Sequence, residues 1–249
     1  MERIKPLYRS LRRRWNLYCK INWVKTIYIN WVLFDYDIAK KLPIIIFGKC
    51  HLANLKGEVI FQQPIKTGMI TFGHKFEVFT KESGCAEVFL QGKWFVNGNI
   101  QFGYDFKLYI ENDASFTSGH MCTFANQTKV ICTNKIILKD HVKIGDESQL
   151  LDSNFHDLID VDTNENIPMK GEIFIDSYVA VGNRTTLMKQ TKLPSYSLLG
   201  SSSLCNKDFL SYGSNNLFAG TPAKFIKSGI ARNWQKEEKA IEEYLTIKL

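Results

Sequence analysis

The fold is decided by residues 175–208, which read IDSYVAVGNRTTLMKQTKLPSYSLLGSSSLCNKD. Every sixth residue of this stretch is aliphatic or cysteine: Ile175, Val181, Leu187, Leu193, Leu199 and Cys205. Four residues after each of the first five stands a small or β-branched residue: Val179, Thr185, Thr191, Ser197 and Ser203. A period of six fits neither an α-helix nor an alternating strand. It is typical of a parallel β-helix, in which each face of a three-sided prism takes six residues.

A second run of the pattern, formed by Leu138, Ile144 and Leu150, lies upstream and is out of phase with the first. The intervening residues 155–171 are polar and lack the repeat, so we expect them to form a protruding loop. One coil cannot bury its own inner face, and coils must therefore stack. We expect the stack to span residues 44–210, as roughly nine coils of about 18 residues. Residues 211–249 should form a turn and an amphipathic helix that closes the open end.

Residues 1–43 read as a separate arm that is basic, aromatic and partly helical. Residues 1–25 hold eight basic residues and one acidic residue, so they carry the whole net charge of +7. The rest of the chain is neutral, which argues against a nucleic-acid partner. Lys and Arg mixed with Trp and Tyr suit an anionic membrane surface. Packing of the arm on the main body or on a neighbouring subunit explains the same pattern.

The chain has no uninterrupted apolar run of the roughly 20 residues that a spanning helix needs. Its basic N-terminus also lacks the apolar segment of a signal peptide. We therefore expect a cytoplasmic protein, with residues 1–25 able to contact the inner face of the membrane. The six cysteines contain no CxxC pair, so neighbouring cysteines cannot build a zinc ribbon.

Three stretches together resemble a known family: IILKDHVKIGDESQLLDSNFH, residues 173–208 (IFIDSYVAVGN to CNKD) and LFAGTPAKFIK. They are similar to the hexapeptide-repeat acyltransferases of the left-handed β-helix superfamily. The nearest members are the galactoside and maltose acetyltransferases and the O-acetyltransferases of capsule and O-antigen synthesis. The resemblance implies a homotrimer that transfers acetyl from acetyl-CoA, without a metal, to a hydroxyl or amine of a sugar in surface polysaccharide biosynthesis.

The resemblance also assigns site residues. The family's catalytic base falls on His156, at the start of the expected loop, where a neutral imidazole suits proton removal from a sugar hydroxyl. Asn126 matches an acceptor-binding asparagine, and a corner asparagine that satisfies the backbone is an equal alternative. Asp152 and Asn154 lie close enough in sequence to orient the ring or to contact the acceptor. The family's coenzyme A contacts along the coils and at the phosphates fall on Asn183, Ser201, Asn206, Lys207, Lys224 and Lys227.

Two other functions remain open at this stage. A γ-type carbonic anhydrase shares the fold, but it needs three histidines on facing coil walls to bind zinc, and the five histidines here show no such spacing. A non-catalytic β-helix scaffold or membrane-surface protein is the main alternative, because of the basic aromatic arm. Measured affinity for coenzyme A separates a scaffold from an acetyltransferase.

Overall fold

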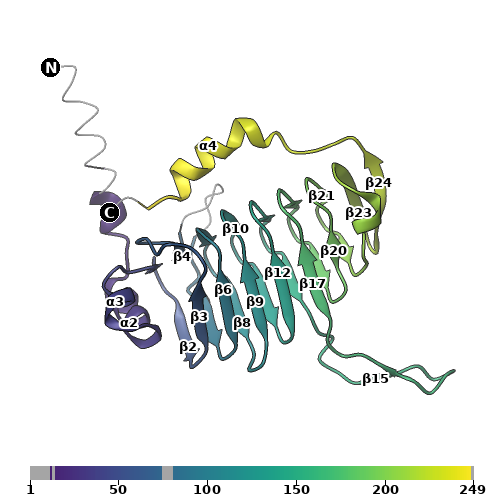
Figure 1. Ribbon diagram of the computed structural model, residues 1–249, viewed down its shortest axis with the longest axis horizontal. Helices are drawn as coiled ribbons and strands as arrows, with labels where there is room; N and C mark the ends of the chain where they lie inside the picture. The colour runs from purple at the N-terminus through teal and green to yellow at the C-terminus, as the bar shows by residue number, and fades with distance from the viewer. Residues whose placement is uncertain (1–11, 13–14, 75–80, 248–249) are drawn as a thin grey trace.

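Three sheets of parallel strands form the body of the molecule in a computed structural model that describes residues 12, 15–74 and 81–247 (Figure 1). Sheet 1 contains β1 (Ile44–Ile46), β4 (Ile70–Phe72), β7 (Ile100–Phe102), β10 (Cys122–Phe124), β13 (Lys143–Ile144), β18 (Ala180–Val181), β21 (Leu198–Leu199), β23 (Asn216–Gly220) and the antiparallel β24 (Ala223–Ser228). Sheet 2 contains β2 (His51–Leu55), β5 (Glu87–Leu90), β8 (Lys107–Ile110), β11 (Lys129–Cys132), β14 (Gln149–Leu151), β19 (Thr186–Met188) and β22 (Leu204–Cys205). Sheet 3 contains β3 (Glu58–Phe61), β6 (Lys93–Val96), β9 (Ser115–Ser118), β12 (Lys135–Leu138), β17 (Glu172–Ile175) and β20 (Lys192–Leu193).

The chain visits sheets 1, 2 and 3 in turn, so each coil has three corners, which we name 1–2, 2–3 and 3–1 after the sheets they join. The prediction of a left-handed parallel β-helix is confirmed. All six residues of the first hexad register are at most 5% exposed, and all five of the second are at most 3% exposed. The aliphatic set therefore forms the axis of the prism, and the small set lies at the corners.

The stack has seven coils, not the roughly nine expected from a uniform length of about 18 residues. Ala180 pairs with Leu198, three hexads further along, as the hexad pattern requires. Ile70, however, pairs with Ile100, which lies five hexads further along. The first coils are longer, and their interior is filled by aromatic rings such as Phe102 and Phe124, whose centroids are 4.4 Å apart. Most of the extra length of the coil that begins at Ile70 is in the connection 73–86 between β4 and β5, so fewer coils use the same length of chain.

A hairpin formed by β15 (Leu158–Ile159) and β16 (Asn166–Ile167) projects from corner 2–3, between β14 and β17 (Figure 1). It lies within the segment expected to form a loop. Its apolar side chains are exposed to solvent, and Val161 at 87% is the most exposed of them. An isolated two-stranded hairpin is marginally stable in water, so its base must be held by the stack.

The outer faces of sheets 2 and 3 carry rows of half-buried apolar side chains. On sheet 2, strand pairing aligns Phe89, Tyr109, Ile131, Leu151 and Met188. On sheet 3, it aligns Ile60, Phe95, Thr117, Ile137 and Phe174. Side chains alternate along a strand, and the neighbours of these residues point into the buried core. Faces exposed to solvent are normally polar, whereas these two outer rows are mainly apolar.

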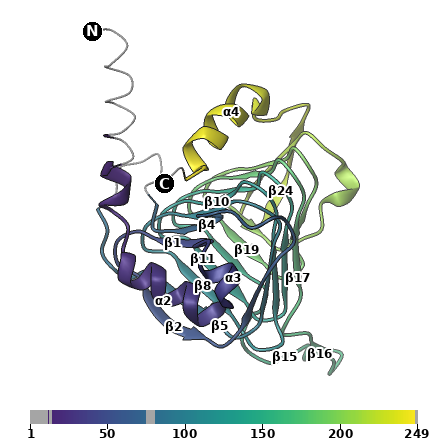
Figure 2. The same cartoon turned by 60° about the vertical axis from the view of Figure 1, so that its left-hand side comes forward.

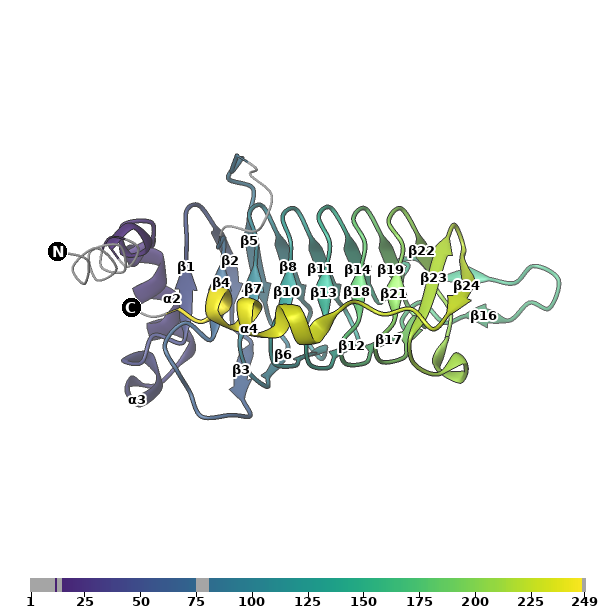
Figure 3. The same cartoon turned by 90° about the horizontal axis from the view of Figure 1, so that it is seen from above.

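Helices lie at one end and along one edge of the stack. Helices α2 (Trp23–Leu33) and α3 (Tyr36–Ala39) cover the N-terminal end (Figure 2). After β24, helix α4 (Trp234–Leu245) turns back along corner 3–1 toward the N-terminal end (Figure 3). The hairpin of β23 and β24, with a 3-10 turn at Leu210–Tyr212, occupies the C-terminal end. The expectation that the C-terminal helix closes the open end is thus corrected.

Aromatic packing explains the position of α4. His141, Tyr178 and Tyr196 occupy corner 3–1 of successive coils, and the centroids of neighbouring rings are 4.7 Å apart. Trp234 packs edge-on against Tyr178 at 5.5 Å, and Glu238 accepts a hydrogen bond from the Tyr178 hydroxyl at 3.2 Å. Burial lowers the pKa of His141, and its Nε2 lies 3.4 Å from the Glu238 carboxylate, so ring packing and polar contacts together hold the helix at this corner.

We expect Leu108→Ala to lower the free energy of unfolding by about 2–5 kcal/mol, because it leaves a cavity at the axis of an early coil. Lys107→Ala removes the exposed neighbour on the same strand and should change stability by less than about 0.5 kcal/mol. Urea denaturation of both variants measures the difference. Equal effects would mean that the early coils are not packed as part of one core.

Candidate functional site

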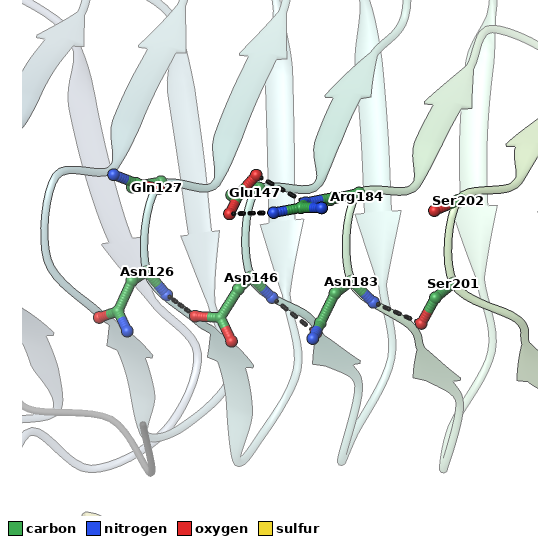
Figure 4. A pocket seen from close by; sticks show the side chains of 8 residues that line it. All are labelled: Asn126, Gln127, Asp146, Glu147, Asn183, Arg184, Ser201 and Ser202. Carbon is green, nitrogen blue, oxygen red and sulfur yellow. Dashed lines mark hydrogen bonds and ion pairs between the residues drawn. The ribbon is translucent and has the colours of Figure 1, made fainter. Parts of the chain in front are cut away.

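A ladder of polar side chains runs along corner 1–2 (Figure 4). Asn126 Oδ1 accepts a hydrogen bond from the backbone N–H of Tyr104, and Asp146 Oδ1 accepts one from the N–H of Asn126. Asn183 Oδ1 and Ser201 Oγ continue the series, accepting from the N–H groups of Asp146 and Asn183 at 3.0 and 3.2 Å. The ladder satisfies corner backbone donors that no strand partner reaches.

Glycine makes room for this ladder. A Cβ on Gly145 would lie 2.5 Å from Asn183 Oδ1, and a Cβ on Gly182 would lie 2.6 Å from Ser201 Oγ. Both distances are shorter than any real Cβ contact. The sequence Gly-Asp at 145–146 and Gly-Asn at 182–183 thus combines a small residue with a ladder residue in each coil.

The ladder lines a shallow pocket of about 410 Å³. Three residues assigned from the family resemblance meet there, namely Asn126, Asn183 and Ser201. The outer wall is formed by Glu147 and Arg184, whose side chains make an ion pair at 2.9 Å. Both of these residues have positive φ, 57° and 56°, which turns their side chains outward at the corner.

Asn126 has a donor to spare in this pocket. The residue is 2% exposed, and its Nδ2 has no hydrogen-bond partner among the described residues. A buried amide donor without an acceptor costs stability unless a ligand or water satisfies it. The oxygen of Asn126 therefore holds the corner, and its nitrogen is left without an acceptor among the described residues.

Corner 2–3 holds the other group of assigned residues. Asp152 is fully buried, and its carboxylate accepts three hydrogen bonds: from Thr133 N at 2.7 Å, Thr133 Oγ1 at 2.9 Å and Asn134 N at 2.8 Å. These contacts join the corner of one coil to the corner before it. We therefore assign Asp152 the structural role of holding this corner, rather than a role in orienting the imidazole or in contacting the acceptor.

The base of the protruding hairpin is clamped beside Asp152. Gly171 donates its N–H to the Asp152 carbonyl, and Asn154 donates its N–H to the Met169 carbonyl. Lys170 bonds through Nζ to Glu111 Oε2 at 2.8 Å and to the Thr133 carbonyl at 2.7 Å. The two strands of the hairpin therefore leave the stack at a fixed point.

His156 lies just outside this clamp and is exposed. Its ring makes no hydrogen bond to any described residue. The nearby Asn154 is half-buried, and its Oδ1 is buried without a partner among the described residues. The imidazole is thus accessible from solvent at corner 2–3.

The remaining assigned residues lie toward the C-terminal end of the stack. Asn206 and Lys207 line a second pocket, of about 660 Å³, at corner 2–3, together with Glu172, Lys192 and Asp208. Lys192 and Asp208 form an ion pair at 3.3 Å in this pocket. Lys224 and Lys227 are exposed on β24, at the edge of sheet 1.

Within one chain, the assigned residues form two groups. Strands of sheet 2 separate the groups: β11 begins after Asn126 at corner 1–2 and ends at Cys132, next to the partners of Asp152 at corner 2–3. Asn126, Asn183 and Ser201 lie at one end of these strands. His156, Asn206 and Lys207 lie at the other. A single chain does not bring His156 to Asn126.

Several residues of the two corners were not anticipated from sequence. Asp146 could have been found, because Asp146, Asn183 and Ser201 each follow an inward aliphatic residue and a glycine. Glu111 could not, because its partner Lys170 is 59 residues away in sequence and no local pattern links them.

Among residues 12, 15–74 and 81–247, no group of three or more His, Cys, Asp or Glu side chains is placed to hold a metal ion. In the same ranges, no helix combines the length and the apolar character needed to cross a bilayer.

Solved structures with a similar chain path include three acetyltransferases. The polySia-specific acetyltransferase NeuO aligns with a TM-score of 0.47 and 20% identity, over 81% of this chain and 86% of NeuO. The polysialic acid O-acetyltransferase OatWY aligns with a TM-score of 0.38 and 14% identity, over 79% of this chain and 100% of OatWY. A hexapeptide-repeat-containing acetyltransferase of Vibrio cholerae O1 biovar eltor, complexed with acetyl coenzyme A, aligns with a TM-score of 0.38 and 14% identity, over 82% of each chain. At these identities the likeness concerns the fold alone. No protein-family model and no curated protein sequence matches the chain.

The assignment of Asp152 to the corner predicts a loss of stability when its carboxylate is removed. We expect Asp152→Ala to lower the free energy of unfolding by roughly 3 kcal/mol, because three donors, two of them buried, lose their acceptor. Asp157→Ala, at an exposed aspartate in the hairpin, should change it by less than about 0.5 kcal/mol. Chemical denaturation compares the two variants. If Asp152→Ala leaves stability unchanged but alters ligand affinity, Asp152 contacts the acceptor and the structural assignment is wrong.

Proposed function

We propose that the chain is an acetyl-CoA-dependent O-acetyltransferase that modifies a sugar hydroxyl in surface polysaccharide biosynthesis. One observation carries the proposal: the only hairpin that interrupts the described coils leaves the stack at His156, the position of the base in the resembling family. The pocket that gathers Asn126, Asn183 and Ser201 supports it from the binding side.

The proposed reaction is an acyl transfer. The sugar oxygen attacks the thioester carbonyl while the His156 imidazole takes the hydroxyl proton. The new C–O bond forms, the C–S bond breaks, and the departing thiolate receives that proton from the imidazolium. A thioester is already reactive, so the tasks of the protein are to remove the proton and to align the two substrates.

The pocket at corner 1–2 has donors that fit the amide carbonyls of the pantetheine arm. Asn183 Oδ1 and Ser201 Oγ accept ladder hydrogen bonds, which leaves the Asn183 Nδ2 and the Ser201 hydroxyl hydrogen for a ligand. Both residues are exposed. We propose that Asn206 and Lys207, which lie at corner 2–3, continue the site from a neighbouring chain. We also propose that Lys224 and Lys227 bind the phosphates, for which exposed ammonium groups are suited.

We propose that a second copy completes the site, in a homotrimer. His156 and Asn126 lie at opposite ends of the sheet 2 strands, so a neighbour must bring a His156 corner to an Asn126 corner. Parallel sheets are normally covered on both faces, and the apolar rows on sheets 2 and 3 are two distinct patches. A closed ring requires two different patches on each chain.

A non-catalytic scaffold is the second candidate, and the exposed aromatic side chains of the N-terminal region favour it. Titration calorimetry with coenzyme A distinguishes the two, because a scaffold should show no heat of binding. We further propose that residues 1–25 contact the inner face of an anionic membrane; of these, residues 1–11, 13 and 14 lie outside the described residues.

We expect His156→Ala to lower turnover roughly 10²- to 10⁴-fold, the usual contribution of a positioned general base. The side chain is exposed, so folding and affinity for coenzyme A should be unchanged. His51→Ala, at an exposed histidine of β2, is the matched control and should retain wild-type turnover. A His156→Ala enzyme that keeps more than about a tenth of wild-type turnover would exclude the base role.

The trimer proposal predicts that Ile131→Lys, in the apolar row of sheet 2, yields a folded monomer. The added charge would be costly when buried in the interface and would cost little on an exposed face. Ser211→Lys adds the same charge at an exposed position outside both rows and should remain trimeric. Analytical ultracentrifugation gives the masses. A trimeric Ile131→Lys variant would place the interface elsewhere, and a monomeric wild type would contradict the assembly.

A further inference from the structure

Helix α2 is amphipathic in the reverse sense: it buries polar side chains and exposes apolar ones. Its three buried residues are Thr26, Ile29 and Asn30, two of which are polar. Every exposed residue of the helix is apolar or aromatic: Val24 (80%), Ile27 (47%), Tyr28 (55%), Trp31 (52%) and Val32 (47%). These five residues, spaced as one helical stripe, form what we name the α2 face.

The polar side chains face inward because they terminate the first coil. Thr26 Oγ1 accepts a hydrogen bond from Ile46 N at 3.0 Å. Asn30 accepts from Ile44 N at 3.1 Å and donates to the Ile44 carbonyl at 2.7 Å. Strand β1 is the edge strand of sheet 1, and these contacts satisfy its otherwise unpaired backbone groups. The orientation of α2 is therefore fixed by the fold, and the α2 face points away from the stack.

Aromatic rings extend the α2 face. The Tyr36 ring of α3 lies 5.8 Å from the Trp31 ring and is 63% exposed. Before the helix, Trp15 and Tyr18 are also exposed, and their rings stack at 6.1 Å. Trp and Tyr are the side chains that favour the boundary between lipid headgroups and acyl chains.

The charges around the face have one predominant sign. Residues 1–43 contain ten basic and three acidic residues, so this segment of the chain accounts for the entire net charge of +7. Of its described acids, Asp35 caps α3 by accepting from Ile38 N, and Asp37 is paired with Lys40 at 2.7 Å. Arg12 and Lys20 are exposed beside the aromatic residues.

We propose that the α2 face docks on an anionic lipid surface, with α2 lying in the plane of the headgroups. An exposed apolar face that is rich in Trp and Tyr and flanked by cations gives this helix the composition of an interfacial helix. A second copy is a poor occupant of the face, because each chain carries its entire net charge of +7 in residues 1–43, the segment that contains α2. Anionic headgroups instead neutralise the charge.

The inference deepens the proposed contact of residues 1–25 with membranes by naming the inserting surface. The site proposed for acetyl transfer is not involved, because α2 lies at the N-terminal end of the prism (Figure 3). The residues that line the two pockets lie at corners 1–2 and 2–3 of later coils. Deletion of residues 1–25 is a poor test, since Ile21 bridges to Phe47 and Asn22 caps α2. Substitutions on the exposed face leave these contacts intact.

The test is co-sedimentation of the full-length protein with phosphatidylcholine vesicles that contain phosphatidylglycerol. We expect Val24→Gln/Ile27→Gln to weaken binding about tenfold or more, because two aliphatic side chains no longer enter the lipid. Val161→Gln/Ile226→Gln removes the same two residue types at exposed positions of similar accessibility elsewhere and should bind as the wild type does. Circular dichroism and thermal midpoints should match for all three proteins.

Tryptophan fluorescence gives an independent readout. Emission should shift to shorter wavelength when wild-type protein binds the vesicles, and Trp31→Phe should bind but lose a large part of the shift. Equal binding of both double variants, or a full shift in Trp31→Phe, overturns the insertion of the α2 face. If binding is abolished by salt but unaffected by Val24→Gln/Ile27→Gln, the electrostatic contact of residues 1–25 stands and this inference fails. A wild type that ignores vesicles and self-associates through residues 24 and 27 also overturns it.

Discussion

One constraint organises the molecule: each face of the prism must direct a single aliphatic side chain to the axis, and each corner must be narrow enough for the chain to turn. The small corner residues meet both conditions at once. Thr191 Oγ1 donates to the Cys205 carbonyl at 2.7 Å, and Ser203 Oγ donates to the Gly200 carbonyl at 2.7 Å. These hydroxyls are buried but satisfied, so the corner costs little. The polar ladder and the hairpin clamp then follow from which corner of which coil a residue occupies.

The fold could be predicted to different depths in the two halves of the chain. From Ile175 to Cys205 the hexads are unbroken, because coils of three hexads are stacked on coils of equal length. In the first half the inward positions are held by rings such as Trp94 and Phe116, and the coils are longer by varying amounts. Coils of unequal length break the six-residue register, which is why the sequence there reads as strands without a period.

The sequence could suggest individual residues of the candidate site, but not how these residues lie relative to one another. Asn126, Asn183 and Ser201 were each assigned separately, and the structure places all three at one corner. A strict 18-residue repeat does not predict this placement, because the coil that begins at Asn126 is longer than three hexads. The buried carboxylate of Asp152 was not distinguishable from an orienting group, because its hydrogen-bond partners lie in the preceding coil. The sequence of α2 also did not predict that its polar side chains are buried, because their burial depends on the unpaired edge of β1 rather than on the helix itself.

The central claim is that catalysis requires His156 from one chain and Asn126 from another. Co-expression of His156→Ala chains with Asn126→Asp chains tests it most directly, because Asn126→Asp keeps an oxygen as the ladder acceptor and replaces the Nδ2 donor with a carboxyl oxygen. In every mixed ring one site combines an intact His156 with an intact Asn126. Acetyl transfer should therefore reappear in the mixture, although each variant alone is inactive. Mixed trimers that remain as inactive as the separate variants would contradict a site shared between chains.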